Sequence, residues 1–284
     1  MTVTSPAPTV LVDVEDLTVA LVGSDARPIL DRVSFSVQPG RMTALVGESG
    51  AGKSMTTKAI LGALDERLFR VSGRMELAGR DLGGLSARER RRHVTGTAAL
   101  VFQNPTRALN PTMRVGAQIA EAMRFAPGRS RLSASDARAR SIELMRQVGI
   151  AAPEDRFDAY PHQMSGGMKQ RAVIAIALSL EPRVLFCDEP TSSLDVTTQA
   201  LIMDLLDELR ERLGLGILFI THDLVLAASR ADDVLVLRDG RLVERLPAAD
   251  LFHTAQDPYT RELISRVPDI SSGAGARSDT RSTP

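Results

Sequence analysis

The sequence has 284 residues, of which 43% are hydrophobic and 25% are charged, and its 35 basic residues balance its 35 acidic ones. Such a chain is long enough for one large globular domain, or for one domain with an inserted subdomain. Zero net charge argues against a general nucleic-acid-binding surface. The single cysteine, Cys187, excludes an internal disulfide and a cysteine-only zinc site.

The ends of the sequence differ in composition from the rest. Residues 1–9 are rich in Thr, Pro and Ala and are predicted to form a loose arm without the features of a signal peptide. Residues 269–284, rich in Ser, Gly, Arg and Asp, are predicted to be a disordered tail. Between them the longest apolar runs, such as residues 172–178, are shorter than the roughly 20 residues that span a bilayer. Any work at a membrane is therefore expected at its surface.

The N-terminal region has strand patterns. Apolar and polar residues alternate in VLVDVEDLTVAL, residues 10–21, and again in RVSFSV, residues 32–37. After a turn at Pro39-Gly40, RMTALVG forms a short apolar strand that leads into glycines. The predicted inward-facing residues of the first strand are Leu11, Val12, Val14, Leu17 and Val19.

Further strands are predicted late in the chain. VLFC, residues 184–187, and GILFI, residues 216–220, are continuously apolar, as expected for parallel strands covered on both faces. In DVLVLRDGRLVE, the pair Asp239-Gly240 separates two apolar runs and predicts a hairpin. The helix between the strands at residues 184–187 and 216–220 is expected to end at Gly214. Its predicted apolar stripe is Leu201, Leu205, Leu209 and Leu213.

The middle of the chain has helical patterns and no convincing strand, from about residue 111 to 159. A first helix carries Val115, Ile119 and Met123 on one face. A second is expected to start at Ser135-Asp136 and to stop at Gly149. Its predicted buried face is Ile142, Met145 and Val148. The sequence therefore predicts an α/β core with a helical insertion.

A glycine-rich loop follows the third strand. GESGAGKS, residues 47–54, fits the pattern G-x-x-x-x-G-K-[ST] between a strand and a helix. Glycines let backbone N–H groups close around a β-phosphate. Lys53 supplies charge to the β- and γ-phosphates, and the Ser54 hydroxyl suits Mg²⁺. The predicted nucleotide-binding residues are Gly47, Glu48, Ser49, Gly50, Ala51, Gly52, Lys53 and Ser54.

Three further polar residues follow buried strands. Asp188 ends the strand VLFCD, where ligands of an α/β sheet collect, and is expected to reach Mg²⁺ directly or indirectly. Glu189 diverges from Asp188 and is placed to polarise water as a general base. His222, at the end of the next strand, is expected to hold that water and Glu189, as a neutral or protonated imidazole. The predicted catalytic residues are Lys53, Glu189 and His222.

A second phosphate-binding pattern lies in MSGGMKQR, residues 164–171. Ser165, Gly166 and Gly167 open a predicted helix, and N–H groups at a helix N-terminus favour negative charge. A simple helix cap would explain the serine but not both glycines. Lys169 and Arg171 are expected to face solvent or acidic neighbours.

In chain order, these motifs resemble those of the nucleotide-binding subunit of an ABC transporter, over residues 10–268. GESGAGKS is similar to Walker A, VLFCDEP to Walker B, and MSGGMKQR to the signature motif. SSLD, residues 192–195, is similar to the D-loop, His222 to the switch histidine, and Gln103 in LVFQNP to the Q-loop glutamine. The resemblance implies the ABC ATPase fold: an α/β P-loop NTPase core of RecA type, an antiparallel β subdomain, and a helical subdomain at about residues 104–163.

The resemblance also implies how the second pattern works. In this family two subunits pair head to tail, so that Ser165–Gly167 of one cap the γ-phosphate held by the other, with Asp195 communicating across the interface. The implied cofactors are ATP and Mg²⁺. Gln103 is implied to contact the metal and to link the core to the helical subdomain. The implied residues around Mg²⁺ are Ser54, Gln103 and Asp188.

Three segments resemble one particular branch of the ABC transporter family. FQNPTRALNP, YPHQMSGGMKQR and DPYTRELISRVP are similar to the peptide/nickel importer branch. That branch implies a second ATPase, a paralogue rather than a copy of this chain, two membrane permease subunits and an extracytoplasmic binding protein. The expected location is the cytoplasmic face of the membrane. The branch favours a peptide, nickel or a metal chelate as cargo, and the sequence of the ATPase leaves a sugar open as well.

Two features depart from the family pattern. Many members place an aromatic residue against adenine near the end of the first strand, where this chain has Leu21. Loss of aromatic stacking, worth about 1–3 kcal/mol per base, predicts weaker or less base-selective nucleotide binding. Some members of this branch also carry a C-terminal cysteine cluster. With Cys187 alone, no iron–sulfur cluster is expected.

One alternative, a non-catalytic partner subunit, is disfavoured by the intact Lys53, Glu189 and His222. The other is a soluble ABC ATPase that acts on nucleic acid or ribosomes. Its only support is the basic run RERRRH, Arg88–His93, which we interpret as a solvated helix face. Relatives of that class tend to have paired cassettes, coiled-coil insertions or zinc cysteines, which this sequence lacks. We therefore expect no nucleic-acid partner.

Overall fold

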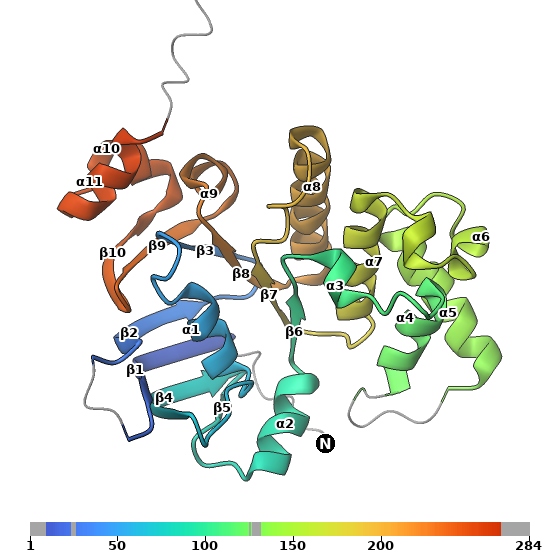
Figure 1. Cartoon of the computed structure of the whole chain (residues 1–284), viewed down its shortest axis with the longest axis horizontal. Helices are drawn as coiled ribbons and strands as arrows, with labels where there is room; N and C mark the ends of the chain where they lie inside the picture. Colours follow the sequence, from blue (N-terminus) through green and yellow to red (C-terminus); the bar gives the residue numbers. More distant parts are fainter. Residues whose placement is uncertain (1–9, 24–26, 125, 127–131, 268–284) are drawn as a thin grey trace, which may run out of the picture.

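A computed structural model describes residues 10–23, 27–124, 126 and 132–267 of the chain. The expected arm, residues 1–9, and the expected tail, residues 269–284, lie outside this range. Figure 1 shows two sheets with helices between and around them, and a cluster of helices to one side. Among the described residues, no helix is long and apolar enough to cross a membrane.

The first sheet is antiparallel and has the strand order β2-β1-β4-β5. All five predicted inward residues of β1 and its approach are buried, so that prediction is confirmed. A register shift between Val14 and Leu17, with Asp16 at φ 51°, allows residues three apart to face the same core. The bounds are β1 Val12–Leu21, β2 Leu30–Val37, β4 Phe69–Leu77 and β5 Arg80–Asp81.

The second sheet has the order β10-β9-β3-β8-β7-β6. All its pairs are parallel except β9–β10, the predicted hairpin, whose turn places Asp239 and Gly240 at positive φ. The carboxyl ends of five parallel strands therefore lie along one edge, which we call the carboxyl edge. The bounds are β3 Met42–Val46, β6 Ala98–Val101, β7 Val184–Asp188, β8 Gly216–Thr221, β9 Asp233–Arg238 and β10 Arg241–Pro247.

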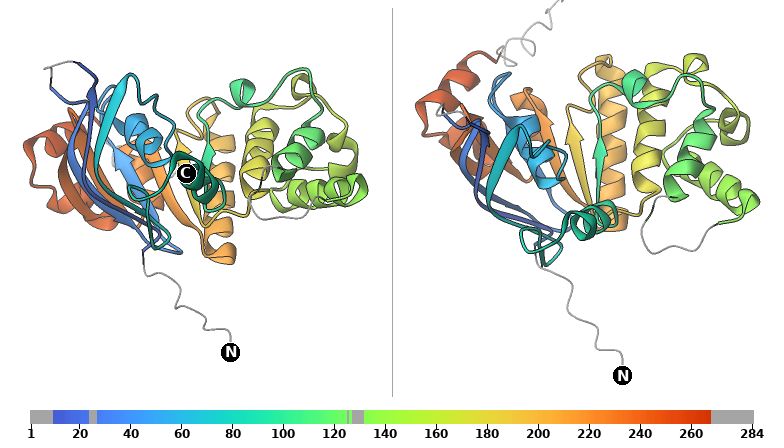
Figure 2. Two further views of the ribbon diagram at one scale, coloured as in Figure 1. Left: turned by 90° about the horizontal axis from the view of Figure 1, so that it is seen from below. Right: turned by 60° about the horizontal axis from the view of Figure 1, so that its bottom comes forward.

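Helices cover both faces of the second sheet. One face, with α1 and α2, packs toward the first sheet and forms one hydrophobic core; the other face, with α7, α8 and α9, shares a core with the helical cluster. Figure 2 shows the two sheets side by side with the helical cluster beyond them. The bounds are α1 Lys53–Ile60, α2 Ala87–Thr95, α7 Gly166–Leu178, α8 Val196–Leu213, α9 Leu224–Arg230, α10 Leu251–Thr254, η2 Ala248–Asp250 and α11 Pro258–Ser265.

The predicted stripe on α8 is partly wrong. Leu205 and Leu209 are buried, but Leu201 and Leu213 are 51% and 49% exposed. A helix has 3.6 residues per turn, so a strict four-residue repeat drifts off the buried face. The helix does end at Gly214, which has φ 65°.

Every described element between residues 104 and 163 is a helix. Val115, Ile119 and Met123 are buried as predicted. The second helix starts at Ala134, one residue before the expected Ser135, because Ser133 accepts a hydrogen bond from the Asp136 N–H and caps it. The bounds are α3 Pro105–Ala108, α4 Val115–Arg124, α5 Ala134–Gln147, α6 Pro153–Phe157 and η1 Pro161–Gln163.

Candidate active site

The glycine-rich loop connects β3 to α1 at the carboxyl edge. Gly47 has φ 150°, and a Cβ atom there would lie 2.2 Å from the Leu237 carbonyl oxygen of β9. Gly52 has φ 109° and is the N-cap of α1. The loop therefore requires glycine both for its backbone conformation and for its close approach to β9.

Lys53 is buried under this loop and is 7% exposed. Its ammonium group donates to the carbonyl oxygens of Gly47 at 2.6 Å and Glu48 at 2.9 Å. Burial lowers the pKa of Lys53, while the nearby charges of Glu189 and Asp188 raise it. The Lys53 ammonium group is thus held where it would contact the phosphates of a bound nucleotide.

Asp188 is the last residue of β7 and lies beside the first turn of α1. Burial raises the pKa of Asp188, a hydrogen bond from the Ser54 side chain lowers it, and the charge of Glu189 raises it further. The structure therefore brings the two predicted metal-binding residues Ser54 and Asp188 together. A desolvated carboxylate in this position gains stability from a cation.

Glu189 is the centre of a hydrogen-bonded group built from three strand ends. Its carboxylate accepts a hydrogen bond from the Gln103 amide at 2.9 Å and lies 3.2 Å from Nδ1 of His222. Its backbone has φ 47°, and its N–H donates to the Ile220 carbonyl at 3.0 Å. A non-glycine residue at positive φ is unusual and marks a constrained site.

The contact between Gln103 and Glu189 was not predicted. Gln103 follows β6 and was expected at the metal, but its side-chain amide instead reaches the predicted general base. The order of strands explains this contact, since β6 and β7 are neighbours and the two residues leave the same edge. Pairing of β6 with β7 could not be read from the sequence.

The second phosphate-binding pattern lies away from this group, at the start of α7. Ser165 is the N-cap and accepts a hydrogen bond from the Met168 N–H at 3.3 Å. A Cβ atom on Gly167 would lie 2.7 Å from the Thr198 methyl group, so close packing against α8 accounts for that glycine. Ser165 and Gly166 are exposed.

Two residues near this helix have local partners. Asp195 caps α8 by accepting from the Thr198 N–H at 2.9 Å and hydroxyl at 2.7 Å, and these bonds lower the pKa of Asp195. Arg171 does not face solvent as expected: its guanidinium donates to the Val148 carbonyl at the end of α5, and burial lowers the pKa of Arg171. Arginine there satisfies a carbonyl that the helix leaves unpaired.

Comparison with known proteins decides the family. Residues 30–192 match the family model described as ABC transporter. The dipeptide transport ATP-binding protein DppD of Escherichia coli (strain K12) is 41% identical over 263 residues, covering 92% of this chain and 79% of that protein. The chain belongs to the ABC transporter family. The oligopeptide transport ATP-binding protein OppD of Mycobacterium tuberculosis is 42% identical, covering 94% of this chain and 43% of that protein.

Solved structures agree with the fold of an ABC cassette. The cbiO1 protein of Clostridium perfringens, part of the ABC transporter complex cbiONQ, has a TM-score of 0.75 at 27% identity and covers 93% of this chain and 98% of that one. A dimeric post-hydrolysis state of the ATP-binding cassette MJ0796, bound to ADP and Pi, has a TM-score of 0.72 at 26% identity and covers 84% and 99%. The predicted ABC ATPase fold is confirmed.

The residues of this ABC cassette fit a magnesium ion bound together with nucleotide. Mg²⁺ prefers oxygen ligands and is usually held by one or two side chains plus substrate phosphates. The Ser54 hydroxyl and the desolvated Asp188 carboxylate are such ligands, and they already contact each other. Among the described residues, no group of three or more His, Cys, Asp or Glu side chains could hold a metal ion without the phosphates of a nucleotide.

Two further sequence features of the cassette are Leu21 and Cys187. Leu21, at the predicted adenine position, is the last residue of β1 and is 47% exposed. Cys187 is buried in β7, and burial raises the pKa of its thiol to about 12. A thiol in that state is neither nucleophile nor metal ligand.

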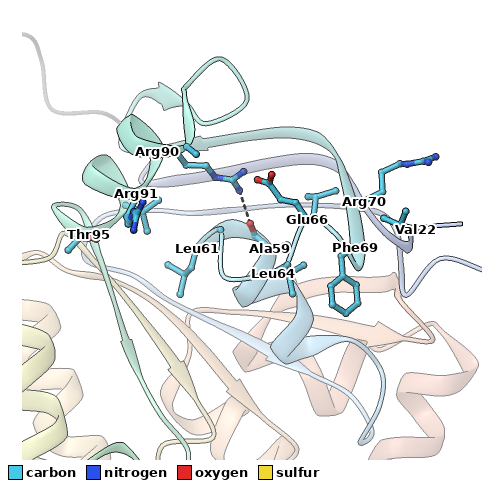
Figure 3. A pocket seen from close by; sticks show the side chains of 14 residues that line it. Val22, Ala59, Leu61, Leu64, Glu66, Phe69, Arg70, Arg90, Arg91 and Thr95 are labelled. Carbon is cyan, nitrogen blue, oxygen red and sulfur yellow. Dashed lines mark hydrogen bonds between the residues drawn. The ribbon is translucent and has the colours of Figure 1, made fainter.

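The basic run Arg88–His93 lies on α2 and is mostly exposed, but Arg90 and His93 are half-buried, and His93 Nε2 lies 2.8 Å from the Leu77 carbonyl oxygen. Arg90 donates to the Ala59 carbonyl of α1 at 2.9 Å and lines a pocket of about 680 Å³ between α1, α2 and β4. Figure 3 shows Arg90 reaching that carbonyl, with Leu61 and Leu64 nearby. Part of the run therefore serves the packing of the cassette.

Proposed function

We propose that this chain is the ATP-binding and hydrolysing subunit of a bacterial ABC importer for peptides, working at the cytoplasmic face of the membrane. ATP hydrolysis coupled to transport is the activity of the family. The observation that carries the proposal is the arrangement around Glu189, which places a carboxylate between Gln103 and His222 at the same edge as Lys53 and Asp188.

The chemistry follows from this arrangement. Lys53 neutralises charge on the phosphate chain, and the glycine loop binds it through backbone N–H groups. Mg²⁺ held near Ser54 and Asp188 would supply further positive charge to the phosphates. Glu189 accepts the proton of the attacking water, while Gln103 and His222 orient its two carboxylate oxygens.

The catalytic site is proposed to be completed by a second ATPase subunit. Ser165 and Gly166 are exposed at a helix N-terminus, where, among the described residues, Ser165 caps α7 and Gly166 packs near Leu194. They would bind the γ-phosphate held by the partner, and Asp195 would lie at the shared interface. The dimeric form of the related cassette MJ0796 supports this arrangement. A paralogue is proposed as the partner, together with two membrane permease subunits and an extracytoplasmic binding protein.

Peptides are the favoured cargo because the two named relatives, at 41% and 42% identity, are dipeptide and oligopeptide transport ATP-binding proteins. Nickel or a metal chelate is the alternative within the same branch. The cargo would be chosen by the binding protein and permeases. The cassette would act through closure of the ATP-bound pair, a population shift driven by ligand binding.

A transport assay tests the proposal. In the native host, Lys53→Ala should abolish uptake of a labelled dipeptide and leave uptake of labelled nickel unchanged. If the variant loses nickel uptake and keeps dipeptide uptake, the cargo is nickel and not a peptide. ATPase activity that is stimulated by RNA and indifferent to permease-containing vesicles would instead favour the nucleic-acid class.

A further inference from the structure

The segment DPYTRELISRVP has no part in the chemistry above, yet it packs against the phosphate loop. Residues 258–265 of the segment form α11, which lies beyond the β9–β10 hairpin at one end of the molecule (Figure 1). Glu48 to Ala51 of the loop share a pocket of about 270 Å³ with Arg238 and with Tyr259 of this helix. The C-terminal helix therefore forms one wall of the loop.

The start of α11 is firmly held. The Glu244 carboxylate of β10 accepts hydrogen bonds from the N–H groups of Gln256 at 2.6 Å and Asp257 at 3.4 Å. The Asp257 carboxylate caps the helix by accepting from the Tyr259 N–H at 2.8 Å, and Pro258 occupies its first turn. Tyr259 is 4% exposed. Its ring is thus fixed by the helix that carries it.

The Tyr259 hydroxyl accepts a hydrogen bond from the Glu48 N–H at 3.1 Å. The Arg238 guanidinium lies 4.7 Å from the centre of the same ring, on its face. Among the described residues, Tyr259 is thus a side chain from the far C-terminal region that bonds directly to the backbone of the phosphate loop.

The hydrogen bond between Tyr259 and the Glu48 N–H affects Lys53, because Lys53 binds the other side of the same peptide group. The Glu48 N–H belongs to the same planar peptide group as the Gly47 carbonyl, which accepts from Lys53 Nζ at 2.6 Å. The N–H and C=O of a trans peptide point in opposite directions, so fixing one fixes the other. Gly47, without a side chain, offers little resistance to rotation of this group.

We propose that Tyr259 is a positioning residue for Lys53, acting through the Gly47–Glu48 peptide. The hydroxyl holds the N–H on one side, and the carbonyl on the opposite side holds the lysine toward the nucleotide phosphates. Hydrogen bonds aligned through one peptide group strengthen each other. The inference rests on the proposed role of Lys53 in binding ATP.

The chain offers a matched pair of variants. Tyr259→Phe removes the hydroxyl and keeps the ring beneath Arg238. Thr260→Val removes the neighbouring hydroxyl, which is fully buried on the same helix and has no hydrogen-bond partner among the described residues. Each variant deletes one buried oxygen from α11, but only the first breaks a contact with the loop.

The measurement is the dissociation constant for Mg–ATP of the purified full chain, by titration calorimetry, with steady-state ATPase activity of the assembled transporter. Tyr259→Phe should raise the dissociation constant and KM roughly threefold to tenfold, the value of one net hydrogen bond, with kcat changed less than twofold. Thr260→Val should bind as the wild type does.

Wild-type binding by Tyr259→Phe, or equal weakening by both variants, would overturn the proposal, since the second result would mean that only the packing of α11 matters. A lower melting temperature of Tyr259→Phe with unchanged ATP affinity would also overturn it. Failure of the wild-type chain to bind ATP would instead contradict the proposed function.

Discussion

The two phosphate-binding regions of this chain differ in what surrounds them. The loop 47–54 is enclosed by its own chain: β9 contacts Gly47, Lys53 lies beneath it, and three further strand ends bring Glu189 and its partners to the same edge. The start of α7 has an exposed Ser165 with a local cap. The first region is thus surrounded by side chains of its own chain, whereas the second is open, and we propose that a second subunit binds there.

The largest expected effect is at the enclosed region. Glu189→Gln keeps the shape of the side chain and removes its ability to accept a proton. We expect hydrolysis to fall at least ~100-fold, as for loss of a general base, while the dissociation constant for ATP stays within about twofold. Single-turnover hydrolysis and ATP titration measure the two quantities. Hydrolysis at the wild-type rate would remove Glu189 from the mechanism.

The next effect separates the two regions. Ser165→Ala should reduce turnover of the assembled transporter about tenfold or more, with ATP affinity of the isolated chain unchanged, because the serine acts on a partner's nucleotide. Ser133→Ala is the control: it removes an equivalent cap from α5, which costs a similar ~1 kcal/mol of stability. A large loss of ATP affinity in isolated Ser165→Ala would mean that this region acts within its own chain.

A smaller effect concerns the contribution of helix α7 to the stability of the fold. Gln170 of α7 is fully buried, and neither polar atom of its amide has a hydrogen-bond partner among the described residues. Gln118 of α4 is also buried, but its amide bonds to Asn110 and Met113 at 2.9–3.0 Å. Gln170→Leu should therefore raise the free energy of unfolding by about 1 kcal/mol, and Gln118→Leu should lower it by about 2 kcal/mol.

Chemical denaturation measures both glutamine variants under the same conditions. Opposite signs are the expected result, since one change removes an unpaired group and the other removes three hydrogen bonds. Loss of stability in Gln170→Leu equal to that in Gln118→Leu would show that the Gln170 amide is satisfied, for example by bound water.

The smallest expected effect tests the adenine position. Leu21→Phe should tighten ATP binding about fivefold, as partial recovery of aromatic stacking on a base. The control is Leu213→Phe, since Leu213 is a comparably exposed leucine at the far end of α8. Titration with ATP and GTP checks the result. Equal ATP affinity of the wild type and Leu21→Phe would mean that adenine does not bind against residue 21.

The sequence predicted the strands with strong patterns and missed the weak ones. Of β4, only Met75 and Leu77 are buried, and its four exposed positions are two arginines, a serine and a glycine, so its hydrophobic alternation is faint. The four residues of β6 include two alanines and are too few to show a period. Both strands are stabilised by their neighbours, β1 and β7, rather than by a signal of their own.

The residues at the carboxyl edge and the contact of His222 with Glu189 were predicted, but the contacts of Gln103 and Tyr259 were not. Motifs and strand ends were sufficient to bring Lys53, Asp188, Glu189 and His222 to one edge, because ligands of parallel sheets collect there. The bond between Gln103 and Glu189 depends on which strands pair, and that between Tyr259 and the loop spans 211 residues. Such contacts follow from tertiary structure alone.

We propose that a single chain holds half of the catalytic machinery. The direct test is ATP hydrolysis by the purified chain at a concentration where sedimentation shows only monomer. We predict that the monomer binds ATP and does not hydrolyse it above background, and that activity appears when a second subunit is added. A monomer that hydrolyses ATP at the full rate, independently of its concentration, would contradict this claim.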